Sequence, residues 1–205
     1  MKRLAILGAS GHGKVVADIA ECCGWDEVVF FDDAWPKVSV NDNWAVAGNS
    51  QALVECLDTF AGVVVAIGNN AIRAEKLRWL SEISAPVVTL VHPSAVISQY
   101  ADLGAGTVVM PGVVVNVSSQ IGDGVILNTG CSIDHDCTIG DCTHISPGAR
   151  LAGGVKVGAQ SWIGIGTSVK QLVQIGQRVT VGAGAAVVTD LPDGVTAVGV
   201  PARPM

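Results

Sequence analysis

The chain has 205 residues, and 18 acidic side chains against 12 basic ones give it a formal net charge of −6. This balance disfavours a general nucleic-acid or anionic-membrane surface, because such partners are bound through clustered basic side chains. No apolar stretch reaches the roughly 18 residues that a membrane-spanning helix needs. The six cysteines include no CxxC pair. We therefore expect a cytoplasmic protein with reduced thiols, no membrane span and no nucleic-acid partner.

The first element predicted is a strand, a glycine-rich turn and a helix, in the segment KRLAILGASGHGKVVADIAECCGW. An apolar run over residues 4–7 is followed by Gly8, Gly11 and Gly13, and then by aliphatic residues at helical spacing. Backbone N–H groups at such a helix start form a phosphate-binding site. The segment therefore predicts a site for a phosphorylated ligand.

Two further strands are predicted to end in polar residues. VVFFDD ends in Asp32 and Asp33, about twenty residues after the glycines, where an acid can hold a ribose or base edge. GVVVAIGNN ends in Gly68 and Asn69, and a helix over 71–83 and a strand near 86–91 follow. Residues 34–49 have no clear period and are predicted to form a loop. Its tryptophans, Trp35 and Trp44, are expected to pack, with covering of the nucleotide as the alternative. The polar ends would meet at the carboxyl edge of a small, Rossmann-like parallel α/β sheet.

A nicotinamide dinucleotide is the obvious rival ligand for this first domain, because the pattern GxxGxG also occurs in dehydrogenases. However, only about four strands are predicted, with no second mononucleotide half and no hydride-transfer residues. One nucleotide diphosphate is the better fit.

The second half of the chain has a period of six. Every sixth residue from Val91 to Val187 is Ile, Leu or Val, and the fourth residue after each of these is small or β-branched. Gly or Asn often follows the aliphatic residue directly, as at Gly140 and Gly158, and we expect these positions to form the tight turns. This period is typical of a solenoid of short parallel strands.

The cysteines and histidines of CSIDHDCTIGDCTHISPG are placed by this period. Cys131 and Cys137 fall on the small interior position and are interpreted as buried hydrophobes. His135 and His144 fall off both interior positions, so we expect them to face outward. No spacing typical of a zinc site is present, and we expect no metal.

The repeats resemble the hexapeptide-repeat, left-handed parallel β-helix family over residues 91–190. The resemblance implies that three hexapeptides form one triangular coil, that the protein is a homotrimer, and that acetyl-CoA lies between neighbouring subunits. The predicted domains are a Rossmann-like UDP-sugar-binding domain over 1–90 and an acetyl-CoA-binding catalytic domain over 91–205.

A narrower resemblance rests on NTGCSIDHDCTIGDCTHISPGARLAGGVKVG. This segment resembles the active-site coil of bacterial sugar-nucleotide acetyltransferases, of the bacillosamine N-acetyltransferase and sialic-acid O-acetyltransferase type. The resemblance implies that His135, flanked by Asp134 and Asp136, is the general base, with His144 as a second active-site histidine. An imidazole suits this role because its pKa lies near neutrality and an adjacent carboxylate can fix its tautomer.

The same resemblance implies further ligand contacts. Gly153 would supply an oxyanion amide and Gly164 would meet the pantetheine arm of acetyl-CoA. Arg203, in GVPARPM, would meet a CoA phosphate or remain a solvated charge. Asn128 would position the substrate or have a purely structural role. In the first domain, the residues implied to bind the UDP-sugar are Ser10, Gly11, His12, Gly13, Asp32, Asp33, Gly68 and Asn69; His12 could instead be an exposed loop residue.

The resulting prediction is acetyl-CoA-dependent N-acetylation of the 4-amino group of a UDP-4-amino-4,6-dideoxy sugar for surface glycan synthesis. A sugar or sialic-acid O-acetyltransferase is the alternative enzyme. A non-catalytic sugar-nucleotide-binding scaffold is the alternative outside enzymes, and the presence of His135 argues against it.

Overall fold

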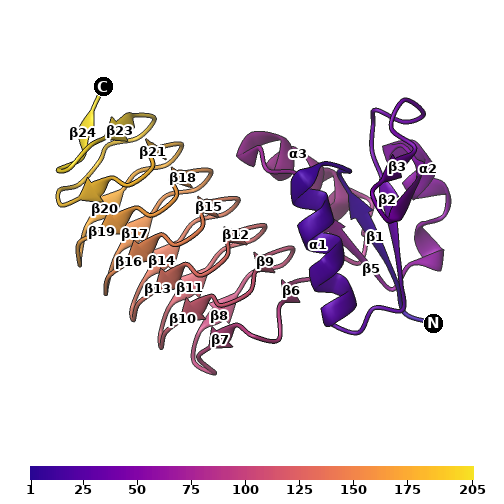
Figure 1. Ribbon diagram of the computed structural model, residues 1–205, viewed down its shortest axis with the longest axis horizontal. Helices are drawn as coiled ribbons and strands as arrows, with labels where there is room; N and C mark the ends of the chain where they lie inside the picture. Colours follow the sequence, from indigo (N-terminus) through magenta and orange to yellow (C-terminus); the bar gives the residue numbers. More distant parts are fainter. The chain divides into compact units, whose positions relative to one another are not determined.

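The structure is a computed structural model that describes all residues, 1–205. It divides into two compact units, Met1–His92 and Pro93–Met205. Figure 1 colours the first unit from indigo to magenta and the second from pink to yellow. None of the helices is long and apolar enough to cross a membrane.

The first unit contains a five-stranded sheet in the order β3-β4-β2-β1-β5. Strands β4, β2, β1 and β5 are parallel neighbours, whereas β3 pairs with β4 antiparallel. The strands are β1 (Arg3–Leu7), β2 (Glu27–Phe31), β3 (Val40–Asn41), β4 (Trp44–Gly48) and β5 (Gly62–Val65). The helices are α1 (Gly11–Cys22), α2 (Ser50–Glu55), the 3-10 helix η1 (Leu57–Thr59) and α3 (Asn70–Glu82).

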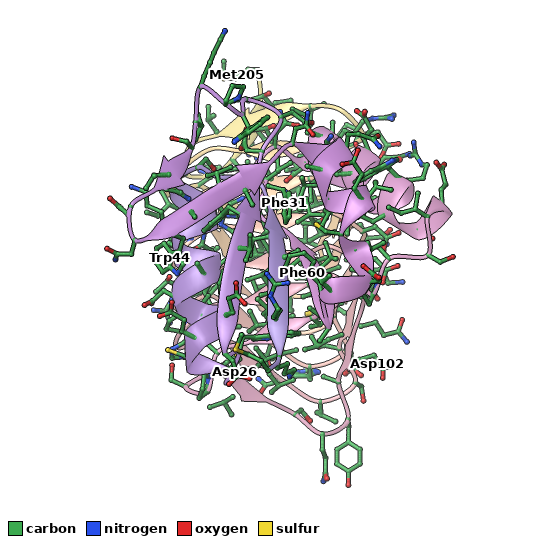
Figure 2. The ribbon with its side chains drawn as sticks, turned by 90° about the vertical axis from the view of Figure 1, so that its right-hand side faces the viewer. Asp26, Phe31, Trp44, Phe60, Asp102 and Met205 are labelled. Atoms are coloured by element: carbon green, nitrogen blue, oxygen red, sulfur yellow. The ribbon has the colours of Figure 1, made fainter.

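The central strands of this unit are covered by apolar side chains on both faces of the sheet. The strands β1 and β5 read as nearly continuous aliphatic runs, which is typical of parallel strands buried on both faces. Phe31 and Phe60, both labelled in Figure 2, pack edge to face with ring centroids 5.7 Å apart. Trp44 also has a packing role, because its ring contacts Phe30 and its Nε1–H donates to Glu21 (2.8 Å).

Two predictions for this unit were wrong. Residues 34–49 are not a simple loop, because they contain β3 and β4, and β4 adds a parallel strand beside β2. In β4 only Val46 and Gly48 are buried, while its exposed positions are alanines, so the alternation has little hydropathy contrast. The strand expected near 86–91 is reduced to a single bridge between Val63 and Val87 and to β6 (Leu90–Val91).

The second unit is a parallel β-helix, whose successive coils are visible in Figure 1. From β7 to β22, each coil contributes one two-residue strand to each of three sheets, with neighbours 18 residues apart, as in the pairing of Val114 with Ser132. The sheets are named here after their first strands in this unit: the β7 sheet (β22-β19-β16-β13-β10-β7), the β8 sheet (β20-β17-β14-β11-β8) and the β9 sheet (β23-β21-β18-β15-β12-β9, with β24 antiparallel to β23).

The strands of this unit fall where the six-residue period predicts. From β7 to β22, the second residue of each strand is the predicted aliphatic residue. The strands are β7 (Val96–Ile97), β8 (Asp102–Leu103), β9 (Val108–Val109), β10 (Val114–Val115), β11 (Gln120–Ile121), β12 (Ile126–Leu127), β13 (Ser132–Ile133), β14 (Thr138–Ile139), β15 (His144–Ile145), β16 (Arg150–Leu151), β17 (Lys156–Val157), β18 (Trp162–Ile163), β19 (Ser168–Val169), β20 (Gln174–Ile175), β21 (Thr180–Val181), β22 (Ala186–Val187), β23 (Thr196–Val198) and β24 (Arg203–Pro204).

Polar side chains at the small interior position form hydrogen bonds between neighbouring coils. Its buried hydroxyls donate to a backbone carbonyl fifteen residues later, at 2.7 to 3.2 Å; they belong to Thr107, Ser119, Thr143, Ser161 and Thr167. The thiol of Cys137 makes the same kind of contact with the carbonyl of Ala152 (3.3 Å). Polar atoms in the narrow core are thus paired, as buried polar groups must be.

The tight turns do not lie directly after the aliphatic residue, which corrects the prediction. Left-handed backbone occurs three residues after it, at positions such as Gly130 (φ +63) and Asp136 (φ +59). The glycines directly after the aliphatic residue have a steric role instead. At Gly140 and Gly158, a Cβ would stand 2.5 Å from a backbone nitrogen of the next coil.

Candidate active site

His135 lies in the turn that follows β13 and is half-exposed (56%). Its Nδ1 is 2.7 Å from Oδ2 of Asp136. Because an ionised carboxylate only accepts hydrogen bonds, Nδ1 carries the proton and Nε2 keeps its lone pair. The hydrogen bond that His135 donates to Asp136, followed by the negative charge of Asp134, raises the pKa of His135. When the ring is neutral, its proton is thus on Nδ1, and Nε2 is the nitrogen that can act as a base.

The left-handed turn of the β-helix places Asp136 beside the imidazole. Asp136 occupies a position that is glycine in many coils, and its φ of +59° is one that short polar side chains such as Asp tolerate. In this backbone conformation its carboxylate reaches back to the ring of the preceding residue. The sequence left open which carboxylate orients His135, and the structure identifies Asp136.

Asp134 has a different role, because it holds the backbone of the turn. Its Oδ1 accepts the His135 N–H (2.8 Å) and an N–H of the Asn116 side chain (2.9 Å). These hydrogen bonds, first the one from the His135 backbone and then the one from Asn116, lower the pKa of Asp134. Asp134 remains ionised and contributes its charge to His135 from a fixed position.

Gly153 lies against the imidazole of His135, one coil later. A Cβ at this position would stand 2.5 Å from Nε2 and 2.6 Å from Cε1 of the ring. Any side chain at position 153 would therefore displace the basic nitrogen. The resemblance gave Gly153 only an amide role, and this steric requirement was not foreseen.

The N–H of Gly153 has no hydrogen-bond partner within the chain, although those of Ala152 and Gly154 are bonded. Side-chain carboxylates accept the equivalent turn amides in other coils, as for Ala105 and Gln177. A free amide next to His135 is available to a ligand.

His144 lies on β15 of the β9 sheet and faces outward as predicted, since Ile145 takes the interior position, but neighbouring side chains on the outer face bury it (6% exposed). Its Nε2 is 3.0 Å from Nδ2 of Asn128, whose Oδ1 accepts the Thr129 N–H (2.8 Å). That backbone donor fixes the amide orientation, so an NH₂ group faces His144 and Nε2 must accept. Asn128 thereby sets the tautomer of His144 with the proton on Nδ1.

Trp162, on the neighbouring strand β18, lies against the other side of His144, with ring centroids 4.1 Å apart. Both residues line a pocket of about 370 Å³ on the β9 sheet that also includes Gly164 and Ile165. Trp162 was not predicted, because an outward-facing aromatic in one coil leaves no periodic signal. This hollow is the candidate site for an elongated, partly apolar ligand.

His135 and His144 are not brought together within one chain. His135 lies in the turn between β13 of the β7 sheet and β14 of the β8 sheet, whereas His144 lies on the β9 sheet. The two histidines therefore belong to different parts of the triangular prism.

Gly164 and Arg203 were also predicted to contact acetyl-CoA. The N–H of Gly164 donates to Val181 and its carbonyl accepts from Thr167, so only its surface is available in the pocket. Arg203 is exposed, and the one hydrogen bond of its guanidinium goes to the carbonyl of Ala202 (3.0 Å).

In the first unit, the predicted acids are engaged by the protein itself. Asp32 accepts the N–H groups of Ala9 (2.7 Å) and Ala34 (2.8 Å), so it braces the glycine-rich turn. Asp33 accepts the Ser50 N–H (2.9 Å) and pairs with Lys76 (2.6 Å). Partial burial opposes ionisation, but the hydrogen bonds from Lys76 and Ser50 outweigh it and lower the pKa of Asp33 to about 2.

The glycines around these acids fall into two groups. Gly13 is needed for packing, because a Cβ there would run into the carbonyl of Gly8 and the ring of Phe30. At Gly11 and Gly68, by contrast, nothing of the chain lies within 4 Å of where a Cβ would stand. These two positions leave room for a ligand to approach the backbone at the carboxyl ends of β1 and β5.

The remaining predicted residues lie at the starts of the two helices. Ser10 is the exposed N-cap of α1 and makes no capping hydrogen bond, while Oδ1 of Asn69 caps α3 by accepting from Ala71 and Ile72. His12 is not an exposed loop residue: its Nε2 is buried and has no partner within the chain. Burial, followed by the charge of Arg73, lowers the pKa of His12 to about 4, so it is neutral at neutral pH.

Arg73 is a buried residue of this site that the sequence did not reveal. It is 1% exposed, and its guanidinium donates to the carbonyls of Ile67 (2.8 Å) and Gly68 (3.1 Å) and to the side chain of Asn70 (2.8 Å). It holds the loop after β5 in shape. No group of three or more His, Cys, Asp or Glu side chains is arranged to hold a metal ion.

A known protein family matches each of the two units. The PglD N-terminal domain matches residues 3–80, and the bacterial transferase hexapeptide family (six repeats) matches residues 118–153. UDP-N-acetylbacillosamine N-acetyltransferase of Bacillus subtilis (strain 168) is 37% identical over 111 residues, which cover 53% of this chain and 51% of that protein. The match thus spans about half the length of this curated relative.

Solved structures match the whole chain. The acetyltransferase domain of PglB from Neisseria gonorrhoeae FA1090 is 41% identical with a TM-score of 0.93, and 100% of each chain is covered. That domain has also been solved in complex with acetyl coenzyme A. PerB from Caulobacter crescentus, in complex with CoA and GDP-perosamine, is 40% identical with a TM-score of 0.94, covering 100% of this chain and 98% of that chain.

The fold and the His135–Asp136 pair thus define an acyltransferase with a Rossmann-like first unit and a left-handed parallel β-helix. More particularly, the chain belongs to the family of acetyl-CoA-dependent sugar-nucleotide N-acetyltransferases that includes the PglB acetyltransferase domain and PerB. The fold class and the family predicted from the sequence are confirmed.

Proposed function

We propose that this protein transfers the acetyl group of acetyl-CoA to the 4-amino group of a UDP-4-amino-4,6-dideoxy sugar, in the synthesis of a surface glycan. The observation that carries the proposal is the orientation of His135: Asp136 holds Nδ1 and Gly153 leaves Nε2 uncovered. The relatives named for N-acetylation of amino sugars support the choice of an amine acceptor.

In this mechanism the 4-amino nitrogen attacks the thioester carbonyl carbon and forms the new N–C bond. The carbonyl π electrons move to oxygen, and the proton of the amine moves to Nε2 of His135. Asp136 stabilises the imidazolium that results. When the carbonyl re-forms, the C–S bond breaks and the departing sulfur takes the proton from His135. The products are the amide and CoA.

The negative charge on the intermediate oxygen requires a hydrogen-bond donor. The free N–H of Gly153 is the donor that we assign to it, as the family resemblance implied. His144 carries its proton on Nδ1 and lines the pocket that we assign to acetyl-CoA. The pocket beside it would hold the pantetheine arm against the surface of Gly164, and Arg203 would meet a CoA phosphate.

The nucleotide would be held by the first unit. Gly11 and Gly68 give it access to the backbone at the start of α1 and the end of β5, where helix N-termini favour phosphate. Ser10, His12 and Asn69 retain donors for it. Asp32 and Asp33 would contribute mainly by bracing this edge, since their oxygens already accept backbone N–H groups.

The separation of the two histidines supports a homotrimer. A site that uses both His135 and His144 is incomplete within one chain, so a neighbouring copy must supply one of them. We place the enzyme in the cytoplasm, where acetyl-CoA and nucleotide sugars are made.

The decisive experiment is CoA thiol release from acetyl-CoA with three acceptors: a UDP-4-amino-4,6-dideoxy sugar, its 4-hydroxyl analogue, and the GDP-linked form of the amine. Rapid release with the amine alone is the expected result. Release with the hydroxyl alone would make the protein an O-acetyltransferase. Release only with the GDP-linked amine would correct the nucleotide, and release with none of them would overturn the proposal in favour of a binding scaffold.

A further inference from the structure

Leu172 is an apolar side chain in an unusual setting. It is 74% exposed and has a φ of +64°, a left-handed backbone conformation that branched apolar residues rarely adopt. Many coils have glycine at this position, for example Gly154 one coil earlier and Gly166 at another corner. Neither burial nor turn geometry explains a leucine here.

The side chain of Leu172 lies over the glycines that carry the active-site imidazole. Its Cδ2 is 2.7 Å from where a Cβ of Gly154 would stand, and its N–H donates to the carbonyl of Gly153 (3.0 Å). The ring of His135 lies on Gly153, and the Gly154 N–H donates to the His135 carbonyl (2.8 Å). Leu172 and His135 therefore flank two consecutive glycines.

The distance between Leu172 and His135 suits a group next to the reacting amine. The α-carbons of the two glycines are about 3.8 Å apart, so the Leu172 methyl groups and Nε2 of His135 are at most roughly 10 Å apart. The 4-amino nitrogen and the C6 carbon of a sugar are bonded to neighbouring ring carbons. A sugar whose amine donates to Nε2 can therefore place its C6 group against Leu172.

We propose that Leu172 contacts the C6 methyl group of the acceptor sugar and selects 6-deoxy sugars over 6-hydroxylated ones. The inference rests on the proposed function and deepens it. Contact between a C6 methyl group and Leu172 removes apolar surface from water, which lowers the free energy of binding. A 6-hydroxyl group at the same place would lose a hydrogen bond to water and meet only methyl groups.

The test compares Leu172→Gly with the wild-type enzyme on two acceptors, the UDP-4-amino-4,6-dideoxy sugar and the UDP-4-amino-4-deoxy sugar that keeps its 6-hydroxyl. Glycine suits the φ of this turn, so the variant should fold. We expect kcat/KM for the 6-deoxy acceptor to fall roughly 10-fold, and that for the 6-hydroxyl acceptor to stay within about 2-fold. The KM for acetyl-CoA should not change.

A second variant and a control isolate the side chain. Leu172→Asn keeps a residue that tolerates left-handed backbone but replaces methyl groups with an amide, and it should also reduce the preference for the 6-deoxy acceptor. Gln160→Gly relieves a similar backbone conformation (φ +58) at another corner and should leave the preference unchanged.

Equal losses on both acceptors would overturn the inference. So would a change in oligomeric state, measured by sedimentation, in Leu172→Gly, because Leu172 would then be a contact between copies. If the wild-type enzyme acetylates the amine and the preference does not change in either Leu172 variant, only this inference fails. If the wild-type enzyme acetylates neither amine, the proposed function fails and the inference fails with it.

Discussion

The imidazole of His135 occupies the space that a side chain at Gly153 would need, because a Cβ there would stand 2.5 Å from Nε2. The two residues are 18 apart in the sequence and are neighbours because each turn of the β-helix stacks on the previous one. Gly153 thus gives His135 the space that its orientation toward Asp136 requires.

Gly153→Ala should therefore damage catalysis without damaging the fold. The added methyl group would overlap Nε2 and Cε1, and a displacement of about 1 Å at the reacting atoms lowers kcat roughly 10²-fold. The exposed ring can move aside, so the midpoint of thermal unfolding should change little. Steady-state kinetics and thermal unfolding of the same samples check both expectations. In a His135→Ala background the substitution should have no further effect, and additive losses would contradict the steric explanation.

His135→Ala should lower kcat by roughly 10²- to 10⁴-fold and leave both KM values largely unchanged, as expected for the loss of a general base. The cause is that the amine proton then has no acceptor in the transition state. The measurement is thiol release at saturating acetyl-CoA. An unchanged rate would remove His135 from the mechanism.

Asp136→Asn should move the acidic limb of the kcat/KM profile to lower pH. The hydrogen bond that His135 donates to Asp136 raises the pKa of His135, so activity falls as pH decreases through that raised value. Without the carboxylate, the imidazole stays neutral to lower pH, but it is a weaker base and the maximal rate is lower. Asparagine tolerates the left-handed backbone of this position, so the turn should persist. A limb that stays in place would mean that another group controls it.

Asn128→Asp should reverse the tautomer of His144. Oδ1 would still accept the Thr129 N–H, but a carboxylate oxygen would face Nε2 and require a proton there. Imidazole ¹⁵N NMR should report Nδ1–H in the wild-type protein and Nε2–H or the imidazolium in the variant. We expect a lower kcat with unchanged KM for the sugar nucleotide. A wild-type spectrum with Nε2–H would contradict the assigned hydrogen bond.

Gly11→Val should raise the KM for the UDP-sugar more than the KM for acetyl-CoA. No atom of the chain lies within 4 Å of where a Cβ at this position would stand, so we expect the valine side chain to take up the space that we assign to the nucleotide. Asp33→Ala should act in the same direction, but it also breaks the contacts with Ser50 and Lys76. Steady-state kinetics with each substrate varied give both KM values. If the KM for acetyl-CoA rises instead, the two ligands have been assigned to the wrong units.

Most of this fold could be predicted from local patterns in the sequence. A six-residue period repeats one local geometry in every coil, so the aliphatic residue of each strand, from Ile97 to Val187, could be identified before any contact was known. The same holds for the turn and helix at Gly8–Gly13, whose signals are adjacent in the chain. The prediction for residues 34–49 was wrong because the exposed positions of β4 are alanines and one of its two buried positions is Gly48, so exposed and buried positions differ little in hydropathy.

The sequence by itself determined the β-helix, the small parallel sheet and, through resemblance, His135 as the residue to examine. Only the tertiary structure decided that Asp136 rather than Asp134 orients the ring, that Gly153 makes room for it, and that Asn128 and Trp162 hold His144. Arg73 and Leu172 also emerged only there. The physical reason is that these relationships join residues one coil or one strand apart in space, and a side chain's burial, backbone angle and hydrogen-bond partner are set by such neighbours rather than by the residues beside it in the chain.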